Sequence, residues 1–165
     1  MENEMIKILF VCHGNICRST MAQSVMTHMI GQLHKTGEFQ IDSAATSREE
    51  IGNPPHYGTV NKLRAVGIPV VPHRARQMTI ADYDTFDYLI GMDDANIRNM
   101  TRIAGGTDSD GKIFKLLSFA QYRNTPTRNL PSARDVADPW YTGDFDATYR
   151  DVVAGCEGLI RYLQI

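Results

Sequence analysis

Two residues near the amino terminus could carry out phosphoryl chemistry together. Cys12 and Arg18 are separated by five residues in the run Val-Cys-His-Gly-Asn-Ile-Cys-Arg-Ser. A thiolate is a strong nucleophile, and a guanidinium can grip two phosphate oxygens at once. Gly14 and Asn15 lie between them and are residues that can adopt positive φ and curl a backbone around an anion. The spacing predicts a loop that holds phosphate beside a cysteine nucleophile.

A carboxyl group that could assist this chemistry lies far along the chain, at Asp138. Attack of a thiolate on phosphorus expels an oxygen that needs a proton, and a protonated carboxyl can supply it. The negative charge of a phosphate substrate favours the protonated form of such a carboxyl. Asp138 could instead serve only as a helix cap or turn residue. Trp140 and Tyr141 could form walls for an aromatic ring, or could simply pack this loop down.

The cysteine loop requires a strand before it and a helix after it. The apolar run 6–11 predicts a buried strand, and from Cys17 the apolar residues follow helical spacing to about Leu33. Periodicity and turn residues predict further strands at 39–43, near 70–71, at 86–92 and at 112–117. The same signals predict further helices from 54 or 55 to 66, from about 93 to 103, and over 145–163.

Alternating strands and helices are typical of an α/β fold with a mostly parallel sheet between two helical layers. Within residues 1–165 we find no repeat or interdomain linker, so we expect a single three-layer domain. Ligands of such sheets bind at the carboxyl ends of the strands, which is where the loop after the first strand would lie. Residues 122–143 hold three prolines and no periodicity, which predicts a functional loop.

Bulk composition narrows the class of protein. The chain has 165 residues and a formal charge of −2, which offers no basic field for nucleic acid. Its apolar stretches are shorter than the ~20 residues that span a bilayer, and its charged first residues are unlike a signal peptide. Three cysteines, an odd number, argue against a disulfide framework. We therefore expect a cytoplasmic protein without membrane or nucleic-acid partners.

The cysteine run and the distant acid together resemble the low-molecular-weight protein tyrosine phosphatases. Residues 11–19 and the pair Asp138-Pro139 carry the resemblance, which extends over essentially the whole chain. It implies a four-stranded parallel sheet, no metal or organic cofactor, protein phosphotyrosine as substrate, and inorganic phosphate or a similar oxyanion in the loop. Cys12 would be the nucleophile, Arg18 the transition-state clamp and Asp138 the general acid and base.

The resemblance also implies supporting roles around the nucleophile. The Ser19 hydroxyl would stabilise the thiolate, Asn15 would shape the loop, and Ser43 and His73 would brace those two. From the residues alone, an ordinary core or surface histidine is the alternative interpretation of His73. The residues implied to contact the substrate are His13, Gly14, Asn15, Ile16, Cys17, Trp140 and Tyr141.

Some residues depart from the pattern of that family. Thr20 replaces a common proline, and His13 stands where an apolar residue or threonine is usual. The run 48–50, Arg-Glu-Glu, occupies a place where many relatives carry an aromatic wall of the phosphotyrosine slot. Cys17 is either a small residue at a helix start or a thiol able to form a reversible disulfide with Cys12. These departures leave substrate preference open.

Three other functions compete with a tyrosine phosphatase. Protein-arginine phosphatases resemble the same loop but typically carry threonine where Ile16 stands, so Ile16 favours an aryl ester. Similar arsenate reductases relay electrons through a further cysteine pair, whereas only Cys17 and Cys156 remain here. A non-catalytic phosphopeptide-binding module would need neither a thiol nor an acid. The sequence therefore predicts a metal-independent protein-tyrosine phosphatase that works through a phosphocysteine.

Overall fold

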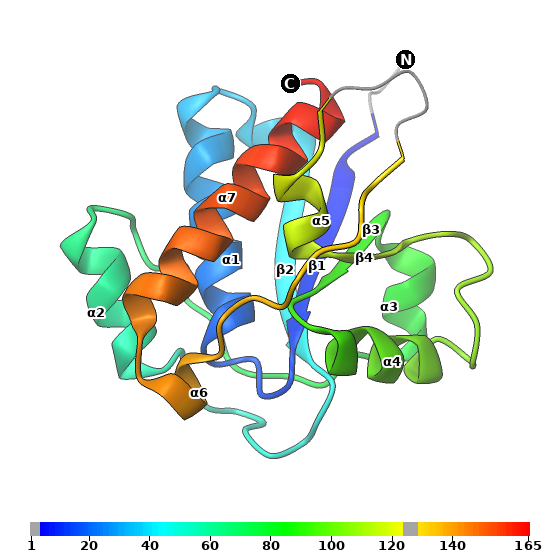
Figure 1. Ribbon diagram of the computed structural model, residues 1–165, viewed down its shortest axis with the longest axis horizontal. Helices are drawn as coiled ribbons and strands as arrows, with labels where there is room; N and C mark the ends of the chain where they lie inside the picture. Colours follow the sequence, from blue (N-terminus) through cyan, green and yellow to red (C-terminus); the bar gives the residue numbers. More distant parts are fainter. Residues whose placement is uncertain (1–3, 124–128) are drawn as a thin grey trace.

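The computed structural model describes residues 4–123 and 129–165 and has one β-sheet at its centre (Figure 1). The four strands are β1 (Ile6–Cys12), β2 (Phe39–Ala45), β3 (Tyr88–Gly91) and β4 (Ile113–Lys115). Their order across the sheet is β2-β1-β3-β4, and every neighbouring pair is parallel. The predicted four-stranded parallel sheet is confirmed.

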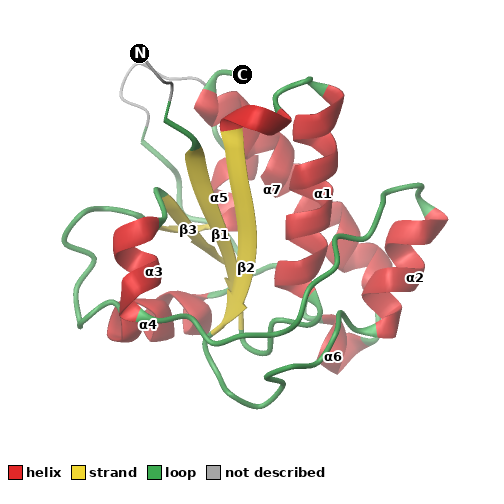
Figure 2. Ribbon diagram, turned by 180° about the vertical axis from the view of Figure 1, so that it is seen from behind, coloured by secondary structure: helices red, strands yellow, loops and turns green. Residues whose placement is uncertain are grey.

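Helices cover both faces of this sheet (Figures 1 and 2). One face is covered by α1 (Arg18–Gln32), α5 (Leu116–Ala120) and α7 (Phe145–Leu163), and the other by α3 (Ile80–Thr85) and α4 (Asp94–Ile103). The helix α2 (Tyr57–Ala65) packs against α1 and α7. The remaining short helices are η1 (Thr36–Glu38) and α6 (Pro139–Thr142). The three-layer arrangement is also as predicted.

Strand β1 is the centre of the core because its side chains are apolar on both faces. Ile8 and Phe10 are fully buried toward α1, α5 and α7, whereas Leu9 and Val11 are fully buried toward α3 and α4. A continuous apolar run is what a parallel strand between two helical layers requires. Cys12 ends this strand on the face of α1, so the position of its sulfur is fixed by the core.

The strand predicted near 70–71 is wrong. These residues form no strand, and the Val71 N–H donates to the Ser24 side chain of α1 instead of a sheet neighbour, at 3.0 Å. Pro69 and Pro72 flank the pair and have no N–H to offer a ladder. Tertiary contact with α1 therefore replaces strand pairing.

Several predicted boundaries shift. The 112–117 run is divided between β4 and α5, because a short apolar run does not distinguish strand from buried helix. Helix α2 begins at Tyr57, after the prolines, with the His56 side chain accepting the Gly58 N–H at 3.0 Å. The 122–143 loop contains the short helix α6, and α3 was not predicted. Part of that loop, 124–128, lies outside the described residues.

Candidate active site

Residues 12–18, which are the loop between β1 and α1 with the residue that flanks it on each side, are called the anion cradle below. Cys12 is 3% exposed at its start. Asn15 has a φ of 60°, a left-handed conformation that asparagine tolerates. Gly14, expected to share that conformation, does not have a positive φ. A Cβ atom on Gly14 would lie 3.3 Å from Glu50 Cγ, so the glycine instead gives a neighbouring loop room to approach.

Carbonyl groups of the cradle are bonded to the structure behind it. The Thr20 hydroxyl donates toward the carbonyl oxygens of Ile16 and Cys17, at 2.9 and 3.1 Å. The His56 N–H and the Thr59 hydroxyl donate to the same two carbonyls, at 2.8 and 3.1 Å. Thr20 thus fixes the start of α1 through its side chain, at the position where a proline would do so by restricting φ.

A chain of hydrogen bonds ends at the Cys12 sulfur. Cys12 Sγ lies 3.0 Å from Ser19 Oγ, which accepts from Asn15 Nδ2 at 2.8 Å. His73 Nε2 lies 2.7 Å from Asn15 Oδ1 and 3.2 Å from Ser43 Oγ. Because the Asn15 amide donates to Ser19, the serine hydroxyl is free to donate to a thiolate. The structure brings the four predicted supporting residues together behind the nucleophile.

The imidazole in this chain favours its neutral form. Burial lowers the pKa of His73 below its ordinary value of 6.5, and the charge of Arg76 lowers it further while Asp42 opposes both. A neutral ring with its proton on Nε2 is the form that donates to the Asn15 carbonyl oxygen. His73 is therefore not an ordinary surface histidine.

Arg18 is buried at the closed end of the cradle, with 3% of its side chain exposed. Its Nη2 lies 2.9 Å from Asp93 Oδ2 and 3.3 Å from Asp138 Oδ2, and its Nη1 donates to the Val136 carbonyl at 3.2 Å. Burial alone would lower the pKa of Arg18, but the negative charges of Cys12, Asp138 and Asp93 raise it. The guanidinium therefore stays charged and aimed by its partners.

Residues 134–143, called the acid segment below, carry Asp138 across to the cradle. Asp138 caps α6 by accepting the Trp140 N–H at 3.1 Å, and it also forms the ion pair with Arg18. Asp138 therefore both caps a helix and lies in the site. Trp140 is 60% exposed and meets the His56 ring edge-on, with ring centroids 6.1 Å apart, whereas Tyr141 is 85% exposed.

Side chains of α7 hold the acid segment. Asp151 Oδ2 accepts the Ala137 N–H at 3.0 Å, and the Thr148 hydroxyl donates to the Ala137 carbonyl at 2.8 Å. Arg134 makes a two-pronged contact with the Asp151 carboxylate, at 2.6 and 2.9 Å. These anchors lie directly before Asp138 and so set where its carboxyl group can reach.

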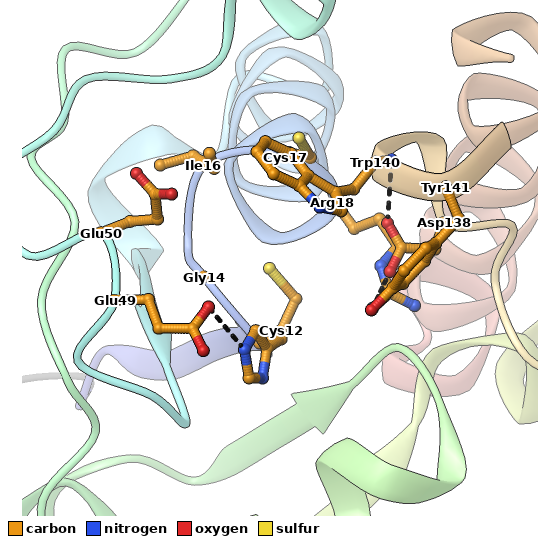
Figure 3. A pocket seen from close by; sticks show the side chains of 11 residues that line it. Cys12, Gly14, Ile16, Cys17, Arg18, Glu49, Glu50, Asp138, Trp140 and Tyr141 are labelled. Carbon is orange, nitrogen blue, oxygen red and sulfur yellow. Dashed lines mark hydrogen bonds and ion pairs between the residues drawn. The ribbon is translucent and has the colours of Figure 1, made fainter. Parts of the chain in front are cut away.

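A cavity of about 190 Å³ opens between the cradle and the acid segment (Figure 3). Its lining residues are Cys12, His13, Gly14, Ile16, Cys17, Arg18, Glu49, Glu50, Asp138, Trp140 and Tyr141. All predicted catalytic residues and all but one of the predicted substrate contacts are in this set. The exception is Asn15, which is completely buried and braces the cradle from behind.

The second cysteine of the loop is a protonated thiol. Cys17 is the cap residue of α1 and is 6% exposed. Burial raises the pKa of Cys17 to about 12, and the charges of Cys12 and Asp138 add to this effect. All three cysteines of the chain, Cys156 in α7 included, are free thiols.

Sequence reasoning missed two residues near the cavity. Asp93 holds Arg18, and Asp151 holds the acid segment. Asp93 had a usable signal, because it follows β3, whose carboxyl end lies beside that of β1. Asp151 carries no local signal, since its role depends on how α7 meets a distant loop. Glu49 and Glu50 line the opening, at the place where the resemblance puts a wall of the phosphotyrosine slot.

Known proteins of one family are similar to this chain over nearly all of its length. A family model described as low molecular weight phosphotyrosine protein phosphatase matches residues 7–165. The low molecular weight protein-tyrosine-phosphatase YfkJ of Bacillus subtilis is 38% identical to this chain over 160 residues, which is 97% of each chain. The human low molecular weight phosphotyrosine protein phosphatase is 36% identical over 162 residues, which is also 97% of each chain. The crystal structure of YfkJ superposes with a TM-score of 0.88 at 37% identity, covering 99% of this chain and 98% of that one.

Proposed function

The chain belongs to the low molecular weight phosphotyrosine protein phosphatase family, and we propose that it performs the reaction of that family through Cys12, Arg18 and Asp138. It is a hydrolase acting on phosphotyrosine. The observation that carries the residue roles is that these three side chains line one cavity, with Asp138 3.3 Å from the Arg18 guanidinium. The Ser19 hydroxyl lies 3.0 Å from the Cys12 sulfur, where it can donate to the nucleophile.

The first half of the reaction transfers the phosphoryl group to sulfur. The Cys12 thiolate attacks phosphorus, an S–P bond forms, and the P–O bond to the tyrosine ring breaks on the opposite side. Asp138 donates its proton to the departing phenolic oxygen. Arg18 binds two of the phosphoryl oxygens and stabilises the charge that spreads over them in the transition state.

The second half of the reaction regenerates the enzyme. Asp138, now a carboxylate, accepts a proton from water as the water oxygen attacks phosphorus. The S–P bond breaks, Cys12 leaves as a thiolate, and inorganic phosphate departs from the anion cradle. Ser19 stabilises the thiolate both as nucleophile and as leaving group, because its hydroxyl is oriented by Asn15.

The exposed aromatic pair and Ile16 fit a substrate with a flat ring. Trp140 and Tyr141 stand at the mouth of the cavity and Ile16 lines its wall, so an aryl group entering toward Cys12 meets apolar surface. We propose tyrosine-phosphorylated proteins as the substrates. Arsenate reduction is not favoured, because the third cysteine, Cys156, is completely buried.

Phosphate esters with graded leaving groups test these roles. Replacing Cys12 by serine should reduce kcat/KM about 10⁴-fold or more for every ester, because the nucleophile is lost. Asp138→Asn should cost about 10²-fold or more with phenyl phosphate and much less with an ester whose leaving group is stable as an anion. Normal turnover by Cys12→Ser would overturn the nucleophile assignment, and equal losses across the Asp138→Asn series would remove Asp138 from the acid role.

A further inference from the structure

Two carboxylates line the substrate cavity without a part in the chemistry above. Glu49 and Glu50, called the acidic wall below, follow β2 in a loop that folds over the anion cradle. Figure 3 shows both carboxylates on one side of Cys12, opposite the acid segment. A substrate that enters this cavity must therefore pass between negative charge on one side and the aromatic pair on the other.

Contacts with the cradle hold the acidic wall in place. Glu50 Oε2 accepts from Asn53 Nδ2 at 2.6 Å, while its Cγ lies against Gly14. Glu49 Oε2 lies 3.0 Å from His13 Nε2. Any side chain at position 14 would press on Glu50, so the cradle needs a glycine there to leave room for the wall. The wall and the cradle are thus built as one unit.

Backbone hydrogen bonds reinforce this connection. The Thr46 N–H donates to the Cys12 carbonyl at 3.0 Å, and the Ser47 N–H and hydroxyl donate to the His13 carbonyl at 3.1 and 2.8 Å. The loop that carries the acidic wall is therefore pinned to the nucleophile's own backbone.

The two arginines near the wall bond elsewhere and do not pair with its carboxylates. Arg48 directs its guanidinium away, and its Nε donates to Gln77 Oε1 at 3.1 Å. Arg74, near the same loop, donates to the Gly52 carbonyl. The Asn53 amide that donates to Glu50 carries no charge, so this hydrogen bond leaves the carboxylate negative.

We propose that the acidic wall selects phosphotyrosine sites that have lysine or arginine beside the phosphotyrosine and disfavours sites with acidic neighbours. The proposal rests on the function proposed above. With the phosphoryl group in the cradle and the ring between wall and aromatic pair, the residues flanking the phosphotyrosine emerge at the mouth beside the two carboxylates. Opposite charges there attract and like charges repel, which sets partner choice more than intrinsic affinity.

Matched phosphopeptides test the acidic wall. Three peptides would share one sequence around a central phosphotyrosine and differ only in having lysine, alanine or glutamate on both sides. Wild-type enzyme should show kcat/KM about 10-fold higher for the lysine peptide than for the glutamate peptide, since each exposed charge pair contributes about 1.5- to 5-fold. High salt should reduce the ratio, because these carboxylates face solvent.

Variants assign the preference to residues. Glu49→Gln with Glu50→Gln should reduce the ratio to within about 2-fold, and Glu49→Lys with Glu50→Lys should invert it. Glu157→Gln, an exposed glutamate of α7 outside the cavity, is the matched control and should keep the wild-type ratio. The ratio between peptides is the readout, so a change in the overall rate of a wall variant does not affect the conclusion.

The possible outcomes distinguish a failure of the acidic wall from a failure of the phosphatase function. Equal turnover of the three peptides by the wild-type enzyme, or a ratio that survives in the doubly neutralised variant, would overturn the role of the wall and leave the phosphatase assignment intact. Failure to hydrolyse every peptide and phenyl phosphate would overturn both. A preference that follows the charge of positions 49 and 50 supports the proposal.

Discussion

The anion cradle and the acid segment meet in one cavity but are held by different forces. Cys12 and Arg18 are each 3% exposed and lie between a central strand and a long helix. The acid segment crosses the surface, with α6 only four residues long and Tyr141 85% exposed. The position of the nucleophile is therefore a property of the core, whereas that of the acid depends on one buried apolar side chain, Val136, and a small number of polar anchors.

The anchors of the acid segment are individually well formed. Burial would raise the pKa of Asp151, but hydrogen bonds from Arg134 and from the Ala137 N–H lower it below its ordinary value of 3.8. The Val136 N–H also donates to the Met92 carbonyl at 2.9 Å, next to the carboxyl end of β3. The two halves of the chemistry can therefore be disturbed separately.

Replacing Arg18 by lysine should give the largest effect on the cradle side. Lysine keeps one positive charge, but it loses the fork that binds two phosphoryl oxygens and cannot reach Asp93, Val136 and the substrate together. We expect kcat to fall by about 10²- to 10³-fold for good and poor leaving groups alike. Arg102→Lys, at an exposed position of α4, is the matched control. A loss confined to poor leaving groups would mean that Arg18 acts through Asp138, and the proposed separation would be broken.

Asn15 tests how strongly the cradle depends on its own backbone. Asn15→Ala loses the bonds to Ser19 and His73 and places a residue with a Cβ and no polar side chain at a φ of 60°. The free energy of unfolding should fall by about 2–3 kcal/mol. Asn15→Gly, which accepts that φ, should lose about 1 kcal/mol less. Urea denaturation measures both, and equal losses would show that the left-handed conformation is not a source of strain here.

Asp151 tests how strongly the acid segment depends on its anchors. Asp151→Asn weakens the pairing with Arg134 and the hold on Ala137, so Asp138 should spend less time in place. We expect kcat/KM for phenyl phosphate to fall about 10-fold, and that for an ester with a stable leaving group to change less than 2-fold. Asp146→Asn, an exposed α7 residue paired with Lys62, should change neither. Equal losses on both esters would indicate a general structural defect.

The same contrast explains what could be predicted from the sequence. Cys12 and Arg18 were located because five intervening residues between a buried strand and a helix leave little freedom. The strand predicted near 70–71 was wrong because the Ser24 hydroxyl, 47 positions earlier, takes the N–H that a sheet would need. The pairing of Arg134 with Asp151 follows from how the acid segment meets α7, and nothing in the local pattern of charges marks it.

The smallest effect is expected in how the free energy of unfolding changes with pH, through His73 behind the cradle. In the unfolded chain its pKa is the ordinary 6.5, and in the folded protein burial lowers it. Below pH 6.5 the unfolded chain therefore binds more protons than the folded one, so stability should fall as the pH drops through this range and should be retained above it. Urea denaturation at pH 7.5, 6.5 and 5.5 measures the slope.

His73→Gln should reduce this slope, because glutamine can occupy the place of Nε2 beside Asn15 and Ser43 without titrating. Gln32→Asn, a substitution of an exposed residue of α1 that does not titrate, should leave the slope as in the wild type. Identical slopes in wild type and His73→Gln would show that protons on other groups control the acid side of the stability curve. A reduced slope would show that a residue bracing the nucleophile titrates in this pH range. Acid would then weaken the cradle itself and not only the acid segment.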